Sequence, residues 1–171
     1  MDTTGTLFFP PGGSTYAGDV DSLFYFIYYA SAVLFALVIG ATIFFIIRYR
    51  RRQQTGKTYG KDHNFALEVT WTVIPTILIL IVFVWGFRSY MRMQVVPRDA
   101  MEVTVTGQKW FWSFGYSTGA TSVNELIVPV GKPVKLLMSS RDVIHSFFVP
   151  GFRTKMDVLP NRYTITWFEA T

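Results

Sequence analysis

The stretch that decides the fold is Leu23–Ile47, LFYFIYYASAVLFALVIGATIFFII, in which no residue is charged. As an α-helix it would extend about 38 Å, at about 1.5 Å per residue. The hydrocarbon core of a bilayer is about 30 Å thick, so this helix is long enough to cross it with some tilt. A signal peptide would have a shorter apolar run with basic residues before it. The stretch is therefore predicted to span a membrane.

A second apolar run, Val69–Phe87, predicts a second span of about 28 Å. Glu68 stands at its start, and Trp71 and Trp85 lie near its two ends. Tryptophan is enriched where a spanning helix meets the two membrane interfaces. The sequence therefore predicts a transmembrane helical hairpin over residues 23–92, preceded by an N-terminal segment, residues 1–22.

Charges on either side of the two spans predict their orientation. The connecting loop, residues 48–62, is strongly basic, whereas residues 1–22 carry acids and no basic residue. The basic residues are Arg48, Arg50, Arg51, Arg52, Lys57 and Lys61, and the N-terminal acids are Asp2, Asp19 and Asp21. The positive-inside rule places the loop on the cytoplasmic or matrix side of an inner membrane, and both ends on the periplasmic or intermembrane side. A basic loop beside a membrane span favours lipid headgroups over nucleic acid as its partner.

The pattern changes after about residue 100 and predicts a small β domain. Strands are expected at Met101–Thr106, Leu126–Val130, Val134–Met138, Val143–Val149 and Arg162–Phe168. Turn signals such as Gly131–Pro133 and Pro150–Gly151 separate them. Short strands at regular spacing predict a Greek-key sandwich or barrel over residues 100–171. The fold class is therefore an α+β membrane protein.

The composition limits the chemistry of this domain. Cysteine is absent, which excludes a disulfide and a thiolate metal site in this chain. Only two histidines occur in 171 residues, which argues against a self-contained histidine metal site. The last predicted strand ends at the chain terminus, so a β sheet would be left with an unpaired edge. Either a partner covers that edge or the natural chain continues, and we favour the second.

Three candidate sites each have a structural and a functional interpretation. The aromatic stretch Gly107–Tyr116, GQKWFWSFGY, fits a core strand or an exposed indole that relays electrons. His145, in the stretch DVIHS, fits a hydrogen-bonding residue or a copper ligand at one end of a β barrel. Glu68 fits an interfacial carboxylate or a functional ionisable group at the membrane. The residues alone leave these alternatives open.

Four segments, in this order and spacing, make the chain resemble subunit II of the haem-copper oxidases, specifically of the cytochrome c oxidase family. They are Glu68–Pro75 (EVTWTVIP), Gly107–Tyr116, Val123–Pro129 (VNELIVP) and Asp142–Pro150 (DVIHSFFVP) running on to Asp157. The resemblance covers residues 23–171. It implies a two-helix transmembrane hairpin followed by a cupredoxin-like Greek-key β domain on the outer face.

The resemblance also implies roles for individual residues. Glu68 would lie at the entrance of a proton pathway into subunit I, and Trp110 would be the surface residue at which electrons arrive from cytochrome c. His145 would be the first histidine ligand of the binuclear copper centre CuA, and Asp157 would lie near subunit I. The family pumps protons and reduces oxygen to water in subunit I, which holds haem and CuB and assembles with further oxidase subunits.

The chain departs from the family pattern in one respect. The remaining CuA ligands of the family lie in a cysteine-containing segment with a second histidine and a methionine, and this chain has no such segment. We therefore expect CuA only in a full-length protein and expect this chain to be truncated. One alternative is the copper-free quinol oxidase subunit II, with a structural role, although His145 favours the cytochrome c branch. A two-span receptor or assembly factor with a β sensor domain is the other.

Overall fold

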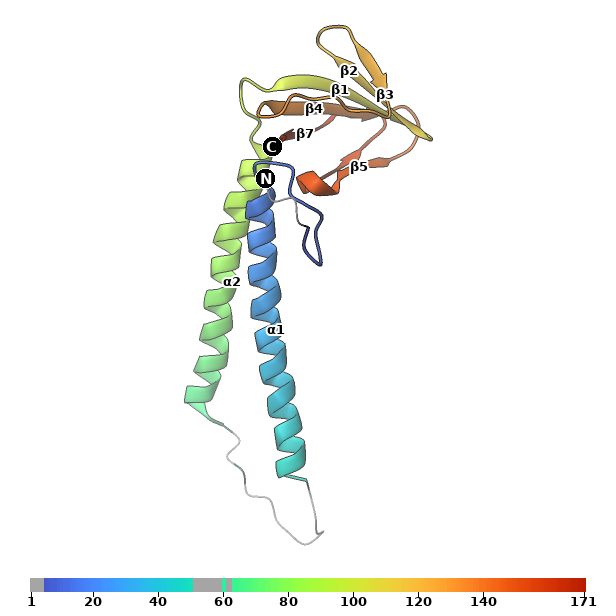
Figure 1. Ribbon diagram of the computed structural model, residues 1–171. Coiled ribbons are helices and arrows are strands. Elements are labelled where there is room, and N and C mark those ends of the chain that lie inside the picture. The colour runs from blue at the N-terminus through green and yellow to red at the C-terminus, as the bar shows by residue number, and fades with distance from the viewer. Residues whose placement is uncertain (1–4, 51–59, 61–62) are drawn as a thin grey trace. The chain divides into compact units, whose positions relative to one another are not determined.

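The computed structural model describes residues 5–50, 60 and 63–171. These residues form two compact units, one comprising the chain up to Ser22 together with Phe87–Thr171, and the other Leu23–Gly86. Within the described residues there are two long helices, seven strands and one short 3₁₀ helix, η1 (Pro150–Phe152) (Figure 1). Four of the basic residues of the predicted loop, Arg51, Arg52, Lys57 and Lys61, lie outside the described part of the chain.

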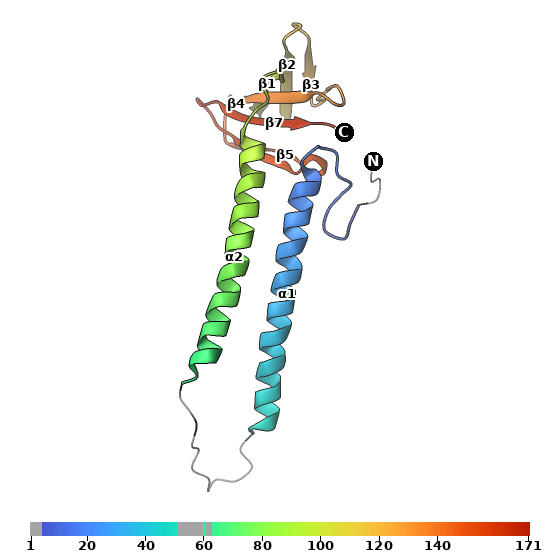
Figure 2. The same cartoon turned by 90° about the vertical axis from the view of Figure 1, so that its left-hand side faces the viewer.

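The two apolar runs form the long helices α1 (Ala17–Arg48) and α2 (Phe65–Gln94). Both are long and apolar enough to cross a membrane, which agrees with the predicted spans. Within residues 23–86 they run side by side in opposite directions (Figure 2). The rings of Phe26 and Trp85 contribute to their contact, with centroids 5.6 Å apart. Helices that are apolar on all sides suit lipid and helix contacts rather than water.

The β domain has two sheets. The larger has the order β3-β2-β1-β4-β7, and the smaller pairs β5 with β6. The strands are β1 (Met101–Gln108), β2 (Phe111–Tyr116), β3 (Thr121–Val123), β4 (Pro133–Ser140), β5 (His145–Val149), β6 (Thr154–Val158) and β7 (Thr164–Glu169). Strands β1 and β4 pair in parallel, whereas the other neighbours are antiparallel. This is the predicted cupredoxin-like arrangement.

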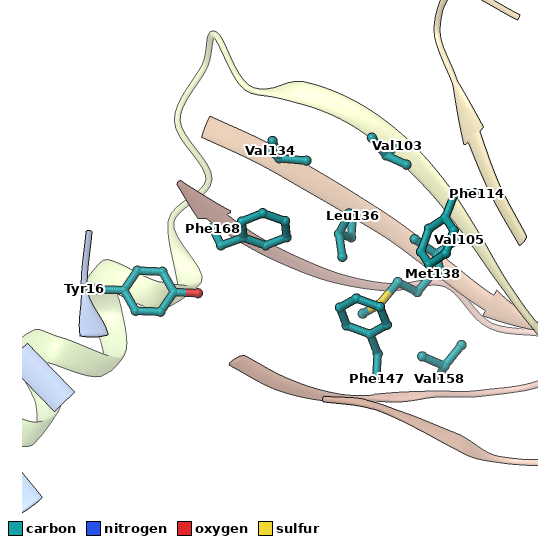
Figure 3. Close-up of a cluster of buried hydrophobic side chains, with 10 residues drawn as sticks. All are labelled: Tyr16, Val103, Val105, Phe114, Val134, Leu136, Met138, Phe147, Val158 and Phe168. Atoms are coloured by element: carbon teal, nitrogen blue, oxygen red, sulfur yellow. The ribbon is translucent and has the colours of Figure 1, made fainter. Parts of the chain in front are cut away.

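The core of the domain lies between the two sheets. Alternate residues of the large sheet face inward, because side chains of a strand point to opposite faces in turn. Figure 3 shows Leu136 and Met138 of β4 opposite Phe147 and Val158 of the small sheet. Leu136, Met138 and Val158 have no exposed surface, and Phe147 is 7% exposed.

The predicted strands are largely found, with one error. Strands β1, β4, β5 and β7 occupy the regions predicted for them, whereas Leu126–Val130 is irregular and the prediction of a strand there is wrong. In this segment the Ile127 N–H donates to the side-chain hydroxyl of Tyr116 at 2.8 Å, and not to a backbone carbonyl as in a strand ladder. Leu126 and Val128 still pack against the core, so the segment alternates like a strand without pairing as one.

The N-terminal segment covers part of the edge of the large sheet. Ser14 forms an antiparallel bridge with Ala170 beyond the end of β7. The Thr15 N–H donates to the Glu169 carbonyl and the Thr171 N–H to the Gly13 carbonyl, both at 3.1 Å. The expected unpaired edge is therefore partly satisfied within the chain, because residues 13–15 lie beside it.

Candidate functional site

The turn between β1 and β2 displays an indole. The ladder closes at the pair Gln108 and Phe111, so the turn consists of Lys109 and Trp110. Trp110 has a φ of 82°, a left-handed conformation that favours glycine and strains a bulky side chain. Its side chain is 95% exposed. A strained, exposed tryptophan at a turn is difficult to explain by packing and marks a candidate functional position.

Asp142 lies beside this turn and is bonded to it. Its Oδ2 accepts the backbone N–H of Lys109 at 2.6 Å, and its Oδ1 accepts the backbone N–H of Val143 at 2.7 Å. The Arg141 N–H also donates to the Gly107 carbonyl at 3.1 Å. The bond to His145, with help from the two backbone donors, holds the pKa of Asp142 well below its usual range.

His145 begins β5 and is the third part of the site. Its Nε2 lies 2.7 Å from Oδ1 of Asp142, and its side chain is 19% exposed. Its ring meets that of Trp112 edge to face, with centroids 5.7 Å apart. A Cβ on Gly107 would lie 3.1 Å from both rings, so glycine at this position allows them to approach the β1 backbone.

The residues around Asp142 and His145 supply one possible metal ligand, His145, and not a complete metal site. A carboxylate bound to one nitrogen of a histidine orients the ring and leaves the other nitrogen for a metal. His145 has this arrangement, since no hydrogen bond to its Nδ1 occurs in the described part of the chain. No group of three or more His, Cys, Asp or Glu residues among those described could hold a metal ion.

The residues of the aromatic stretch differ in their exposure. Phe114 is 4% exposed and belongs to the core, whereas Trp110 is exposed. Trp112 lies between these extremes and meets Phe147 edge to face, with centroids 5.5 Å apart. The alternation of β2 therefore explains Trp112 and Phe114, and leaves Trp110 unexplained by packing.

Glu68 lies in the first turn of α2, away from the residues above in the sequence. Its Oε1 is 2.7 Å from His63 Nδ1 and accepts the Asn64 N–H at 3.3 Å. The Asn64 side chain in turn accepts the Leu67 N–H at 3.2 Å. Reciprocal bonds of this kind cap a helix start. The Glu68 side chain is 34% exposed, so a capping role and a proton-transfer role are both compatible with its surroundings.

Sequence reasoning missed three of these contacts, which are those of Asp142 with His145, of Asp142 with the Lys109 N–H, and of His63 with Glu68. The spacing of three residues between Asp142 and His145 could have indicated their contact. Nothing in the sequence indicated the bond from the Lys109 N–H to Asp142. His63 has no distinguishing motif around it in the sequence, but it precedes Glu68 by five residues and reaches its carboxylate. Asp157 is exposed on β6 and pairs with Ser146 in the ladder. It therefore lies on the opposite face of the small sheet from His145.

Two sequence families match this chain. Residues 2–89 match the transmembrane domain of cytochrome c oxidase subunit II, and residues 120–171 match the periplasmic domain of the same subunit. The first match alone covers more than half of the chain. The chain belongs to the cytochrome c oxidase subunit II family. It is accordingly a two-span membrane protein with its β domain on the periplasmic side.

Individual relatives agree with this membership. Cytochrome c oxidase subunit 2 of Thermostichus vulcanus is 30% identical over 95% of this chain and 66% of the relative. The subunit of Alkalihalophilus pseudofirmus is 36% identical over 82% of this chain and 44% of its own length. The chain thus spans less than two thirds of either relative. The crystal structure of the periplasmic domain of subunit II of cytochrome oxidase from Bradyrhizobium japonicum is 31% identical over 44% of this chain and 67% of that one, with a TM-score of 0.42.

Proposed function

We propose that this subunit II chain accepts electrons from cytochrome c at Trp110 and directs them inward by way of His145. The observation that carries the proposal is the pair of bonds made by Asp142. One links it to the turn that displays Trp110, at 2.6 Å, and the other links it to His145, at 2.7 Å. An exposed indole and an oriented imidazole are thereby held in one bonded unit.

The residues of this unit have distinct roles in the proposal. The indole of Trp110 contacts the donor, because it is almost fully exposed. The Lys109 peptide and the Asp142 carboxylate give a short, hydrogen-bonded connection to His145. The free Nδ1 of His145 would bind copper in a protein that supplies the remaining ligands. A binuclear copper centre supplies one-electron redox chemistry when it is bound.

The wider assembly follows from family membership and is part of the proposal. The two spans would anchor the chain in the lipid bilayer beside subunit I and the other oxidase subunits. Subunit I would hold haem and CuB and reduce oxygen to water, with proton pumping across the membrane. This chain would contribute to electron acceptance rather than to the oxygen chemistry itself.

Replacement of His145 tests the copper role in the complete oxidase. In His145→Ala we expect the near-infrared absorption of CuA to disappear while the haem bands remain, because an oriented ligand is lost. His63→Ala is the matched control, since it removes the other histidine of these 171 residues, and it should keep the band. An unchanged band in His145→Ala would refute the assignment. A wild-type oxidase without the band would favour the copper-free quinol oxidase alternative.

Replacement of Trp110 tests the route of the electrons. Trp110→Ala should slow reduction by cytochrome c about tenfold or more, on the scale of residues that position reacting groups. Reduction by a small artificial donor that reaches the haems directly should be unchanged. Equal rates with cytochrome c in the variant and the wild type would contradict the proposed role of Trp110.

We also propose that Glu68 collects protons for the pathway into subunit I. Its carboxylate is partly exposed at the start of α2 and is paired with His63, so a titratable partner lies within hydrogen-bonding distance. Glu68→Ala should slow proton uptake during reduction of the haem-copper site, by about 10²-fold if Glu68 acts as a positioned acid or base. Asn64→Ala is the control, because it removes a cap of α2 and no carboxylate. Equal slowing in both variants would indicate a capping role alone.

A further inference from the structure

Asp142 uses both of its carboxylate oxygens inside the molecule. Oδ2 accepts the Lys109 N–H at 2.6 Å, whereas Oδ1 accepts the Val143 N–H and lies beside His145 Nε2, both at 2.7 Å. Charge-assisted bonds of this length are among the stronger ones in proteins. The orientation of the carboxylate is therefore fixed from two sides, by the turn and by the ring.

The turn needs such a bond more than an ordinary turn does. Trp110 has a left-handed φ of 82°, and strain of this kind persists only where the surrounding structure holds it. The β1–β2 ladder fixes the two ends of the turn at Gln108 and Phe111. The bond from Lys109 to Asp142 fixes the peptide between them, which leaves the indole of Trp110 in its exposed position.

We propose that Asp142 is a positioning residue, whose two oxygens hold the Trp110 turn and the His145 imidazole in one arrangement. The inference rests on the proposed function, because electrons would pass from one of these groups to the other. An exposed acid could instead serve to attract a basic electron donor. The two roles differ in what they require, since attraction needs only the charge, whereas positioning needs both oxygens at their present places.

Three variants separate these roles. Asp142→Asn keeps the shape, but its amide has one acceptor oxygen, so an NH₂ group must face either the Lys109 N–H or the Val143 and His145 side. Asp142→Glu keeps the charge and moves the oxygens by one methylene. Glu125→Gln is the matched control for charge, because Glu125 is an exposed acid that follows β3. Under positioning, both Asp142 variants are impaired and the control is not.

Hydrogen exchange measures the arrangement without reference to activity. In the complete oxidase in detergent micelles, we expect the Lys109 amide to exchange about tenfold faster in both Asp142 variants, since local opening governs exchange. Glu125→Gln should leave this amide as protected as in the wild type. Thermal denaturation of each variant verifies that the domain is folded. Unchanged protection in Asp142→Asn and Asp142→Glu would overturn the proposal.

Reduction kinetics with cytochrome c supply the second measurement. Positioning predicts that kcat falls in both Asp142 variants, by about 10–100-fold as for other residues that orient a ligand, with the salt dependence of kcat/KM unchanged. Attraction predicts normal rates in Asp142→Glu and a weaker salt dependence in Asp142→Asn, and either result would overturn positioning. The exchange experiment stays informative even if Trp110→Ala shows that electrons do not enter at Trp110.

Discussion

The two ends of strand β5 (His145–Val149) carry polar residues that are used in opposite ways. Before β5, the carboxylate of Asp142 bonds to groups of its own loop and of the neighbouring turn, and it lies at the surface. After β5, the guanidinium of Arg153 is almost fully enclosed, with 5% of its side chain exposed. Both are charged groups with several partners. Those of Asp142 lie within its own loop and the β1–β2 turn, whereas those of Arg153 include residues of the N-terminal segment.

Arg153 holds the N-terminal segment against the β domain. Its Nε and Nη2 donate to the two carboxylate oxygens of Asp21 at 2.7 and 2.8 Å. Nη2 also donates to the Pro10 carbonyl at 2.8 Å, and Nη1 to the Pro150 carbonyl at 2.7 Å. The guanidinium carbon lies 4.7 Å from the ring centre of Phe9. Arg153 thus joins segments more than a hundred residues apart.

The contacts of Arg153 are therefore expected to affect the stability of the domain, and those of Asp142 its functional site. The Arg153 guanidinium is enclosed, so removing it would leave the carboxylate of Asp21 without its partner and the two segments without their link. The bonds of Asp142 lie at the exposed surface, where water competes for the same groups, so they contribute less to global stability. They fix the local positions of an exposed indole and an imidazole instead. Substitutions at the Arg153 end should therefore destabilise the domain, and those at the Asp142 end should alter the site.

The largest effect is expected for Arg153→Ala. Removal of one partner of an enclosed ion pair typically costs about 3–5 kcal/mol, because the other charge is left without compensation. Thermal denaturation in micelles should show a lower Tm, and limited proteolysis should cleave the N-terminal segment, residues 5–16, more readily. Arg162→Ala is the control, because Arg162 is exposed, and it should change neither. An unchanged Tm in Arg153→Ala would remove the distinction between the two ends.

A smaller loss is expected for Tyr16→Phe, at the same end. The Tyr16 hydroxyl donates to the Trp167 carbonyl at 2.8 Å and also contacts the Thr154 hydroxyl. Its ring is 2% exposed. Loss of the hydroxyl leaves buried acceptors without a donor, which costs about 1–3 kcal/mol. Chemical denaturation of the variant and the wild type at neutral pH measures this difference.

The same residue gives a pH dependence. Burial raises the pKa of Tyr16, while its bond to Thr154 acts in the opposite direction. Tyrosine in the unfolded chain ionises near about pH 10. Above that pH the unfolded state loses a proton that the folded state retains, so the wild type loses stability. The advantage of the wild type over Tyr16→Phe should shrink as the pH rises beyond about 10, and a constant difference would contradict the buried, neutral hydroxyl.

Sequence patterns predicted the elements well, because hydropathy and alternation reflect burial directly. The two helices and strands β1, β4, β5 and β7 follow from these periods. Leu126–Val130 has the alternation of a strand without a partner strand, so the pattern alone misled. Contacts across the chain were harder to predict, since nothing near Arg153 in the sequence indicates Asp21. Glu68, His145 and the aromatic stretch that contains Trp110 were candidates from the residues, and the family resemblance assigned their roles. Neither indicated that Asp142 links Trp110 to His145.

The smallest effect on stability, and the sharpest test of the site, is expected for Gly107→Ala. The added Cβ would lie 3.1 Å from a ring atom of His145 and 3.1 Å from one of Trp112, so both rings must shift by a few tenths of an ångström. Overpacking that neighbours can relieve costs about 1 kcal/mol, at the low end of its usual range.

Gly115→Ala is the matched control for this substitution. Its Cβ would meet only Thr104 atoms, at 3.9 and 4.0 Å, which is ordinary contact, and Gly115 lies on β2 beside β1. The NMR chemical shifts of the His145 ring should therefore change in Gly107→Ala and stay constant in Gly115→Ala. Equal shifts in both would mean that the imidazole is not held closely against β1, and the Asp142 end would then lack the rigidity that distinguishes it from an ordinary surface loop.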